Sequence, residues 1–296
     1  MSPMKSTLED SPRLSVVLPA KNESAAIGSV LSHLREICAG AEIIVVDDGS
    51  QDDTAAVARK AGAHVISRPY SQGNGAAIKT GARAATGAVI VFMDADGQHD
   101  PADIPRLLAK LDEGHDMVVG ARDSQSQASQ WRGLANRFYN RLASYITGHR
   151  IEDLTSGMRA ARASHFREFL HLLPNGFSYP TTSTMAFFRA GYSVAYIPIR
   201  AAKRVGKSHI RLFRDGTRFL LIIFKIGTLY SPLKIFGPVA LSMFLAATGW
   251  YAHTYLSAAR FTNMSALLYS GSVITFMMGL ISEQITSLMY KDTGQH

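Results

Sequence analysis

The sequence has few residues that could crosslink the chain and few charges. Cys38 is the single cysteine among 296 residues, which excludes an intramolecular disulfide and a cysteine-based zinc site. Charged residues make up 18% of the chain, and 23 acidic residues stand against 31 Lys and Arg. The net charge of +8 favours an anionic partner: nucleic acid, anionic lipid or a phosphorylated substrate. A hydrophobic fraction of 47% excludes a disordered polymer and fits one large domain, alone or with an appendage.

Residues 1–13 lack an apolar run behind their charges, so we expect no secretory signal there and interpret them as a short disordered lead. The long apolar runs lie near the other end, where residues 235–256 and 266–282 contain no Lys, Arg, Asp or Glu. About 20 apolar residues cross a bilayer, so we predict a transmembrane helical hairpin over residues 233–290. The second span then requires Glu283 and Gln284 to lie near the membrane boundary or to face protein. The alternative is a pair of buried core helices.

Basic residues predict the orientation of this hairpin. Eight Lys and Arg residues between positions 203 and 234 precede the first span, whereas the loop between the spans holds only Arg260. The positive-inside rule therefore places the preceding domain and both termini in the cytoplasm, at an inner or plasma membrane. Residues 208–232 combine apolar residues at helical spacing with four basic ones, which is typical of an amphipathic helix at a membrane surface. A charged helix packed on the soluble domain is the alternative.

Short runs rich in Val and Ile alternate with helical patterns over the first 120 residues. We predict strands at 14–18, 42–46, 64–66, 88–93 and 117–119, and helices at 25–38, 54–61, 75–85 and 102–112. Ser24 and Asp53 are expected to be N-caps, and Pro101 suits a first helical position. The alternation predicts an α/β fold with a mostly parallel sheet covered by helices on both faces. Ligands of such sheets gather at the carboxyl ends of the strands.

Polar loops follow three of the predicted strands at that edge: residues 18–23 (LPAKNE), 47–50 (DDGS) and 94–96 (DAD). Asp94 and Asp96 are two residues apart, so they share a face at a strand end and can hold one divalent cation. Mg²⁺ and Mn²⁺ take oxygen ligands and bridge phosphates. The alternative is an acidic turn that caps the next helix, a role that suits Asp100. Asp47 and Asp48 can accept hydrogen bonds from a base or ribose, or can simply form a tight turn.

Two glycine-containing loops are candidates for phosphate contacts. Residues 71–77 open a helix, but their glycine spacing fits neither a P-loop nor a dinucleotide fingerprint, and a plain flexible loop is an equal alternative. Arg204 and Lys207 surround Gly206 next to the amphipathic segment and can clamp a phosphate or diphosphate. Ordinary juxtamembrane charge is the alternative there.

The segments SVVLPAKNE, VVDDGS, VFMDADGQHDP, DLTSGMR and RVGKS occur in this order. Together they resemble the inverting glycosyltransferases of family 2, and in particular the branch of dolichol-phosphate mannose synthase and bacterial polyprenyl-phosphate glycosyltransferases. The resemblance covers about residues 14–230 and implies a GT-A fold, with the glycosyltransferase domain at 14–207. It implies a membrane-anchored enzyme of envelope glycan synthesis that moves a hexose from a UDP- or GDP-sugar to a polyprenyl or dolichyl phosphate. The implied cofactor is Mg²⁺ or Mn²⁺.

The resemblance also implies a role for each matched residue. The nucleotide would contact Pro19, Ala20, Asn22, Glu23, Asp47, Asp48, Lys79 and Asp94. The metal would bind Asp94, Asp96 and Gln98. The acceptor or a phosphate would meet Arg122, Arg132, Asn136, Asn140, Ser156, Arg159, Arg204, Lys207 and Ser208. The catalytic candidates are Asp96, Asp153 and Arg132. Residues 73–75 lack the basic residue, and residues 177–182 lack the acid, that relatives often have there.

A lipid phosphate is largely ionised near neutral pH, so it can attack the anomeric carbon without a strong general base. We therefore expect a single displacement with inversion, in which the metal neutralises the leaving diphosphate. One alternative is a family 2 transferase with another acceptor, such as diacylglycerol or a glycan; another is a non-catalytic membrane scaffold. Nucleic acid is not expected as a partner, because no recognition motif occurs. A homo-oligomer formed through the hairpin stays open.

Overall fold

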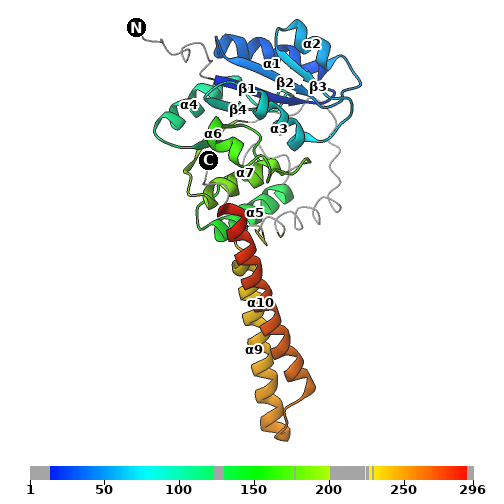
Figure 1. Cartoon of the computed structure of the whole chain (residues 1–296), viewed down its shortest axis with the longest axis vertical. Helices are drawn as coiled ribbons and strands as arrows, with labels where there is room; N and C mark the ends of the chain where they lie inside the picture. Colours follow the sequence, from blue (N-terminus) through cyan, green and yellow to red (C-terminus); the bar gives the residue numbers. More distant parts are fainter. Residues whose placement is uncertain are drawn as a thin grey trace, which may run out of the picture. The chain divides into compact units, whose positions relative to one another are not determined.

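The computed structural model describes residues 14–122, 130–176, 178–200, 224, 227–228 and 230–291 (Figure 1). The chain divides into two units. The first holds residues 1–141 and 150–210, and the second holds residues 142–149 and 211–296. The predicted lead and most of the predicted amphipathic segment lie outside the described residues, so the domain limits given above stay predictions.

A seven-stranded sheet of order β3-β2-β1-β4-β6-β5-β7 forms the centre of the first unit. Its strands are β1 (Leu14–Ala20), β2 (Glu42–Asp47), β3 (His64–Ser67), β4 (Val89–Phe92), β5 (Met117–Arg122), β6 (Arg159–Arg162) and β7 (Val194–Ile199). Neighbouring strands are parallel except at β6, which pairs antiparallel with β4 and β5. The prediction of a mostly parallel sheet is confirmed, and the first five strands fall on the five predicted runs.

Helices cover both faces of the sheet, as the sequence predicts. On one face α1 (Ser24–Ile37), α2 (Thr54–Lys60) and α4 (Ile104–Asp112) contribute to a core in which Leu31 and Leu107 join Val45 and Val91. The other face carries α3 (Asn74–Ala84), α6 (Ala163–Glu168) and α7 (Tyr179–Arg189). There the ring of Phe92 on β4 lies 4.4 Å from that of Phe166 on α6. The apolar runs are buried on both sides because each strand lies between these two helical layers.

The N-cap residues of the first helices agree only in part with those predicted from the sequence. Glu23 is the N-cap of α1, so Ser24 is the first helical residue and its predicted capping role is wrong. Its backbone N–H donates to the carboxylate of Asp52, 3.2 Å away. Asp53 is the N-cap of α2, although its side chain makes no capping hydrogen bond. Asp100 caps the short helix η1 (Pro101–Asp103) by accepting a backbone N–H at 2.9 Å, which is the alternative role predicted for it.

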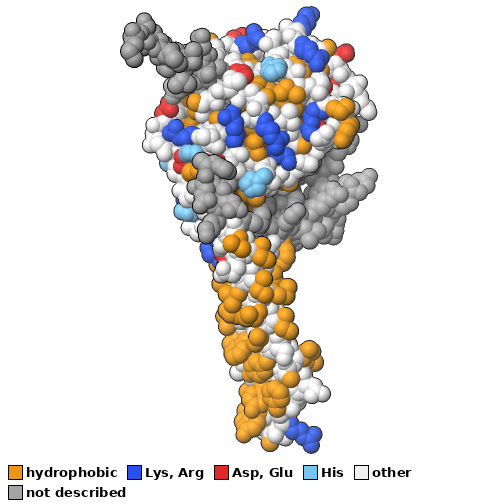
Figure 2. Space-filling model, viewed as in Figure 1, with side chains coloured by type: hydrophobic (Ala, Val, Ile, Leu, Met, Phe, Trp, Pro, Cys, Tyr) orange, Lys and Arg blue, Asp and Glu red, His pale blue; other side chains and the backbone are white. Residues whose placement is uncertain are grey.

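The second unit contains the predicted hairpin. Its helices are α9 (Pro232–Ala258) and α10 (Asn263–Lys291), and both are long and apolar enough to cross a membrane, with mean hydropathies of 1.4 and 1.6. Only 11% and 17% of the residues in their most apolar windows are buried, so the alternative of two core helices is wrong. Figure 2 shows hydrophobic side chains covering the outside of these two helices.

Polar side chains of the second unit complete the ends of its helices. Glu283 accepts a hydrogen bond at 3.3 Å from the backbone N–H of Leu233, one of the donors in the first turn of α9 that have no partner within the helix. Of the two positions predicted for this acid, near the membrane boundary or facing protein, the contact with Leu233 agrees with the second. Lys234 donates at 2.8 Å to the carbonyl of Ile146, near the end of α5 (Gln130–Thr147). A cation is favourable there because the last carbonyls of a helix carry partial negative charge.

Candidate active site

The loops that follow β1 and β2 are joined at the carboxyl edge of the sheet. Asn22 makes this connection, because its backbone N–H donates to Ser50 Oγ at 3.0 Å and its Oδ1 accepts from the Gln51 N–H at 2.8 Å. Its backbone has a φ of +56°, a left-handed conformation that Asn tolerates better than most residues. The other residues of this loop with a predicted nucleoside contact are Pro19, Ala20 and Glu23. They lie at or just beyond the end of β1.

Asp48 holds the segment that follows β3. Its carboxylate accepts hydrogen bonds from Arg68 Nη1 at 3.0 Å, Ser71 Oγ at 2.7 Å, and the N–H groups of Gln72 and Gly73 at 2.9 Å. Burial opposes the charged form, but these hydrogen bonds and the charge of Arg68 lower the pKa of Asp48 overall. Four donors fill the acceptor positions of a carboxylate, so the ionised side chain fixes this segment in place.

The segment held by Asp48 forms one wall of a cavity of about 480 Å³. The lining residues are Lys21, Asn22, Gly49, Ser50, Gln51, Arg68, Pro69, Tyr70 and Ser71. The volume suits a small-molecule site, which typically measures about 300–1,000 Å³. Tyr70 is 65% exposed and therefore available to stack on a ligand ring. Sequence reasoning missed Arg68 and Tyr70, although their position directly after a parallel strand could have indicated them.

Of the eight predicted nucleotide contacts, Asn22 lines this cavity and the other seven, among them Asp47 and Lys79, do not. Asp47 is buried behind it and accepts the backbone N–H of Ser50 at 3.0 Å. Lys79 lies on α3, donates to the carbonyl of Leu173 at 3.1 Å and also contacts the amide oxygen of Asn175. Burial and the nearby charges of Arg83 and Arg68 lower the pKa of Lys79. The nucleotide contacts predicted for Asp47 and Lys79 stay predictions.

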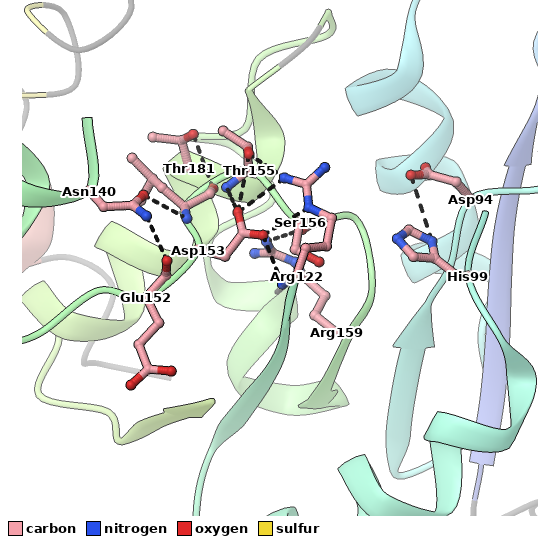
Figure 3. Close-up of polar contacts among 11 residues, drawn as sticks. Asp94, His99, Arg122, Asn140, Glu152, Asp153, Thr155, Ser156, Arg159 and Thr181 are labelled. Carbon is pink, nitrogen blue, oxygen red and sulfur yellow. Dashed lines mark hydrogen bonds and ion pairs between the residues drawn. The ribbon is translucent and has the colours of Figure 1, made fainter. Parts of the chain in front are cut away.

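Asp94 lies just after β4 in an environment that disfavours its charge. Its side chain is 36% exposed, and the Nδ1 atom of His99 lies 3.9 Å from one carboxylate oxygen (Figure 3). Loss of hydration raises the pKa of Asp94, and the negative charge of Asp96 adds to this rise; His99, Arg122 and Arg159 act in the opposite direction. The His99 Nδ1 atom is itself buried and has no hydrogen-bond partner among the residues that the structure describes. This arrangement leaves negative charge that a bound cation would neutralise.

The donor set around Asp94 fits a cation that takes oxygen ligands from both protein and substrate. Asp96 Oδ1 accepts the backbone N–H of Gln98 at 3.1 Å, so the side chains of all three predicted metal ligands belong to one tight turn. Among the described residues, no group of three or more His, Cys, Asp or Glu side chains is placed to hold a metal ion. Two carboxylates and one amide oxygen suit Mg²⁺ or Mn²⁺, which usually keep positions open for phosphate oxygens.

Asp153 is, by contrast, fully paired. Arg122, the last residue of β5, donates from Nε to Asp153 Oδ2 at 2.9 Å, from Nη2 to Oδ1 at 3.1 Å and from its backbone N–H at 3.2 Å. Thr155 Oγ1 accepts from Arg122 Nη2 at 2.6 Å and lies 3.1 Å from Asp153 Oδ1 (Figure 3). Burial disfavours the ionised carboxylate, but the hydrogen bonds and charge of Arg122 lower the pKa of Asp153 overall. Asp153 is therefore ionised and already occupied.

Arg159 fixes the loop that follows Asp153, and this loop passes next to Asp94. Its completely buried guanidinium donates to the Ser156 carbonyl at 2.6 Å, and to the Pro180 carbonyl at 2.9 Å and Ser183 Oγ at 2.7 Å in the first turns of α7. This fixes residues 156–159 so closely to β4 that a Cβ on Gly157 would clash with the Asp94 carboxylate. Asp94 and the segment of Asp153 are thereby neighbours.

Two predicted acceptor contacts are corrected by this burial. Ser156 and Arg159 are both 0% exposed, so an acceptor does not reach either side chain in this structure. Their role is to support the loop. The side chains of Arg132 and Asn136 on α5, and residues Arg204, Lys207 and Ser208, lie outside what the structure describes. Asn140, also on α5, contacts the backbone of residues 152–154, and its predicted acceptor contact stays a prediction.

Comparison with known families agrees with this geometry. Residues 15–170 match the family described as glycosyl transferase family 2, and residues 231–288 match the family described as the GtrB C-terminal hairpin. The first match covers more than half of the chain, and the chain belongs to glycosyltransferase family 2. With its two apolar helices and the hairpin match, it is a membrane-bound member.

Individual relatives share much of the chain. A dolichyl-phosphate hexose transferase of Haloferax volcanii is 33% identical over 217 residues, which cover 72% of this chain and 93% of that protein. An undecaprenyl-phosphate 4-deoxy-4-formamido-L-arabinose transferase of an Enterobacter species is 37% identical over 171 residues, covering 54% of this chain and 51% of that protein. Glucosyl-3-phosphoglycerate synthase from Mycobacterium tuberculosis, crystallised with Mn²⁺ and UDP-glucose, has a TM-score of 0.59 and 26% identity, covering 73% of this chain and 78% of that chain. The GT-A fold is thus confirmed.

Proposed function

We propose that this chain transfers a hexose from a UDP- or GDP-sugar to a polyprenyl phosphate at the membrane. The observation that carries the proposal is that the loop of Asp153, whose carboxylate holds Arg122, packs against Asp94. The charge of Arg122 acts on Asp94, and Gly157 of the Asp153 loop packs directly against it. Such a site suits two phosphate-bearing substrates, one held through a cation and one held by an arginine. The relatives named for transfer to dolichyl and undecaprenyl phosphate support it.

The donor half of the site lies at the ends of β1 to β4. The cavity bordered by Asn22 and Tyr70 would receive the nucleoside, and its position at the same sheet edge as Asp94 directs the diphosphate toward the acids. Asp94, Asp96 and Gln98 would hold Mg²⁺ or Mn²⁺. The bound ion would neutralise charge on the departing nucleoside diphosphate.

The acceptor half of the site is centred on Arg122. Its Nε and Nη2 atoms are committed to Asp153 and Thr155, and among the described residues none accepts a hydrogen bond from Nη1. The side chain is 28% exposed, so Nη1 is available to an acceptor phosphate. Asp153 holds the guanidinium in one orientation, which matters because arginine recognises phosphate through a planar array of donors.

The arrangement supports a single displacement with inversion. An oxygen of the lipid phosphate forms a bond to the anomeric carbon while the bond from that carbon to the diphosphate oxygen breaks. No proton has to be removed from the nucleophile, since a phosphate monoester is largely ionised near neutral pH. This agrees with the state of Asp153, which is paired with Arg122 and is not a free general base. Alignment by Arg122 would lower the entropic part of the barrier.

The hairpin would keep this site beside the leaflet that contains the lipid phosphate. The loop between α9 and α10 holds a single basic residue, Arg260, whereas seven basic residues between positions 203 and 225 precede α9 and Lys234 lies in its first turn. By the positive-inside rule the catalytic domain and both termini lie in the cytoplasm.

The test is sugar transfer by the purified full-length protein in detergent. It would receive a polyprenyl phosphate, Mn²⁺ or Mg²⁺, and a panel of radiolabelled UDP- and GDP-sugars, with Asp96→Asn as the matched variant. Formation of one labelled lipid that requires the metal and is lost in the variant supports the proposal. Donor hydrolysis without labelled lipid would point to another acceptor. Absence of both turnover and nucleotide binding would remove the enzymatic function.

A further inference from the structure

We infer that Asn140 on α5 is a positioning residue that acts through the backbone on both sides of Asp153, and thereby orients Arg122 toward the acceptor. The inference rests on the proposed function, because orientation of Arg122 matters for the reaction only if Arg122 meets a phosphate. It differs from the prediction made for Asn140 from the sequence, which was direct contact with the acceptor.

The geometry is that of a two-point clamp. Asn140 Nδ2 donates to the carbonyl of Glu152 at 2.6 Å, and Asn140 Oδ1 accepts from the N–H of Leu154 at 3.1 Å. These two backbone groups flank Asp153 (Figure 3). A side-chain amide has a donor and an acceptor in one plane, so it can replace the partner strand that this backbone lacks.

The clamp is needed because residues 150–158 form no helix or strand. Backbone N–H and C=O groups away from water require partners, and here side chains supply them. Thr181 Oγ1 on α7 donates to the Leu154 carbonyl at 3.3 Å, while Asn140 serves the N–H of the same residue. Asp153 is therefore presented by a segment that is held by side chains of two helices.

The position of this segment determines the position of Arg122. Asp153 binds both Nε and Nη2 of the guanidinium, so a displacement of the carboxylate would rotate or release the arginine. A shift of about 1 Å in a positioning group is enough to cost roughly a hundredfold in rate. Removing the Asn140 amide would also leave the Glu152 carbonyl and the Leu154 N–H without these partners.

The kinetic test compares Asn140→Ala with Thr147→Val, a change on the same helix that removes a 2.9 Å hydrogen bond to the Ala143 carbonyl but no contact with residues 152–154. We expect Asn140→Ala to lower kcat/KM for the lipid phosphate by about ten- to a hundredfold, mainly through KM for that substrate, because Arg122 loses its orientation. The KM for the nucleotide sugar should change less than about twofold, because the donor half of the site is untouched. Thr147→Val should retain nearly full activity. Equal losses in both variants, or a loss confined to the donor KM, would overturn the inference.

A double-mutant cycle tests the route of the effect. If Asn140 acts only through Asp153, then Asn140→Ala should lower the residual rate of the Asp153→Asn protein by less than about twofold. Additive losses would show that Asn140 acts elsewhere and would overturn the inference. Asn140→Asp, which keeps the size and one acceptor but loses the Nδ2 donor, should fall between wild type and Asn140→Ala.

Hydrogen exchange gives a readout that needs no turnover. Asn140→Ala should accelerate amide exchange in a peptide covering residues 152–156, while Thr147→Val should leave that peptide unchanged. Unchanged exchange in Asn140→Ala would overturn the clamp itself. If the wild-type protein transferred no sugar to polyprenyl phosphate, the proposed function would fail, and the exchange result would still decide whether Asn140 holds the segment.

Discussion

Asp94 and Asp153 lie in neighbouring parts of one site, yet their surroundings act on them in opposite directions. Asp94 has His99 3.9 Å away as a weak partner, and its pKa is raised by lost hydration and by Asp96. Asp153 accepts bidentate hydrogen bonds from the Arg122 guanidinium, and its pKa is lowered although it is more deeply buried than Asp94. Carboxylates whose environments differ in this way usually perform different tasks.

This difference indicates which of the two acids binds a ligand. A carboxylate whose charge is costly in the free protein gains most when a cation binds, so the strain at Asp94 is consistent with a metal and diphosphate site. A carboxylate that is already satisfied gains little from a ligand and instead fixes its partner. Exposure alone does not account for these roles, because the pKa is lowered at the more buried acid, Asp153, and raised at the 36% exposed Asp94. Hydrogen-bond saturation separates the two acids.

The largest expected effect comes from removing a carboxylate at the donor half. Asp96→Asn or Asp94→Asn should lower metal-dependent transfer by about a hundred- to a thousandfold, because groups that stabilise developing charge in an enclosed site are worth about 3–4 kcal/mol each. Steady-state transfer assays with Mn²⁺ over a wide concentration range measure this loss.

Although Asp94→Asn should lower activity, it should not lower the stability of the folded protein. Folding raises the pKa of this acid, so its charge opposes folding at pH values above its ordinary value and does not do so well below it. The melting temperature of the metal-free Asp94→Asn protein at pH 7 should therefore equal or exceed that of wild type. A lower melting temperature would mean that a partner stabilises the Asp94 charge. The surroundings of Asp94 and Asp153 would then not act in opposite directions.

Asp153→Asn should show the opposite combination. It breaks the pair with Arg122, and removing one partner of a buried ion pair costs about 3–5 kcal/mol, here nearer 3 because Arg122 is 28% exposed. Transfer should fall by about a hundredfold, mainly through KM for the lipid phosphate, since Arg122 loses its orientation.

The pH dependence follows from the lowered pKa of Asp153. Such a group stabilises the folded state above its ordinary pKa, and this stability is lost as the pH falls below about 4 through the lowered value. The melting temperatures of wild type and Asp153→Asn should therefore differ most near neutrality and converge in acid. A constant difference from pH 7 to pH 3 would exclude the ionised pair as its source.

Gly157→Ala perturbs the contact between Asp94 and the loop that carries Asp153, without removing either acid. The added Cβ would meet the Asp94 carboxylate, so either Asp94 or the loop of Asp153 must move. We expect a loss of about ten- to a hundredfold in kcat, with the melting temperature changed by only a few degrees, because the fold has room to adjust but the site does not. A crystal structure of the variant, or Mn²⁺ titration in the presence of UDP or GDP, would locate the displacement.

Much of the fold and the donor acids could be predicted from the sequence because their signals are local. The apolar run before Asp94 identifies β4, and the spacing of Asp94 and Asp96 suggests a metal site at its end. The hairpin is equally local, since the uncharged runs at residues 235–256 and 266–282 are visible directly and the first is long enough to cross a bilayer.

The rest depends on contacts between distant residues. β6 (Arg159–Arg162) contains two arginines and only two alanines, so no apolar run announces the antiparallel strand between β4 and β5. The family resemblance assigns Arg159 to the acceptor, but the side chain is completely buried and donates to the backbone of Ser156 and of Pro180 on α7. The selection of Arg122 by Asp153, 31 residues later, likewise requires the folded chain.

Thr155→Val should have the smallest effect of these changes, because it removes one neutral hydrogen bond from the Arg122–Asp153 pair. The hydroxyl of Thr155 accepts from Arg122 Nη2 at 2.6 Å and lies 3.1 Å from Asp153 Oδ1, so it completes the saturation of the pair without contributing charge. A single neutral hydrogen bond is worth about 1 kcal/mol, and we expect about a fivefold lower kcat/KM for the lipid phosphate with the donor KM unchanged. Thr147→Val on α5, which removes a hydroxyl but no contact with Arg122 or with residues 152–155, is the matched control. If Thr155→Val changed the donor KM instead, the hydrogen bonds of Asp153 would contribute to binding of the nucleotide sugar. The assignment of Asp94 to the donor and Asp153 to the acceptor would then be wrong.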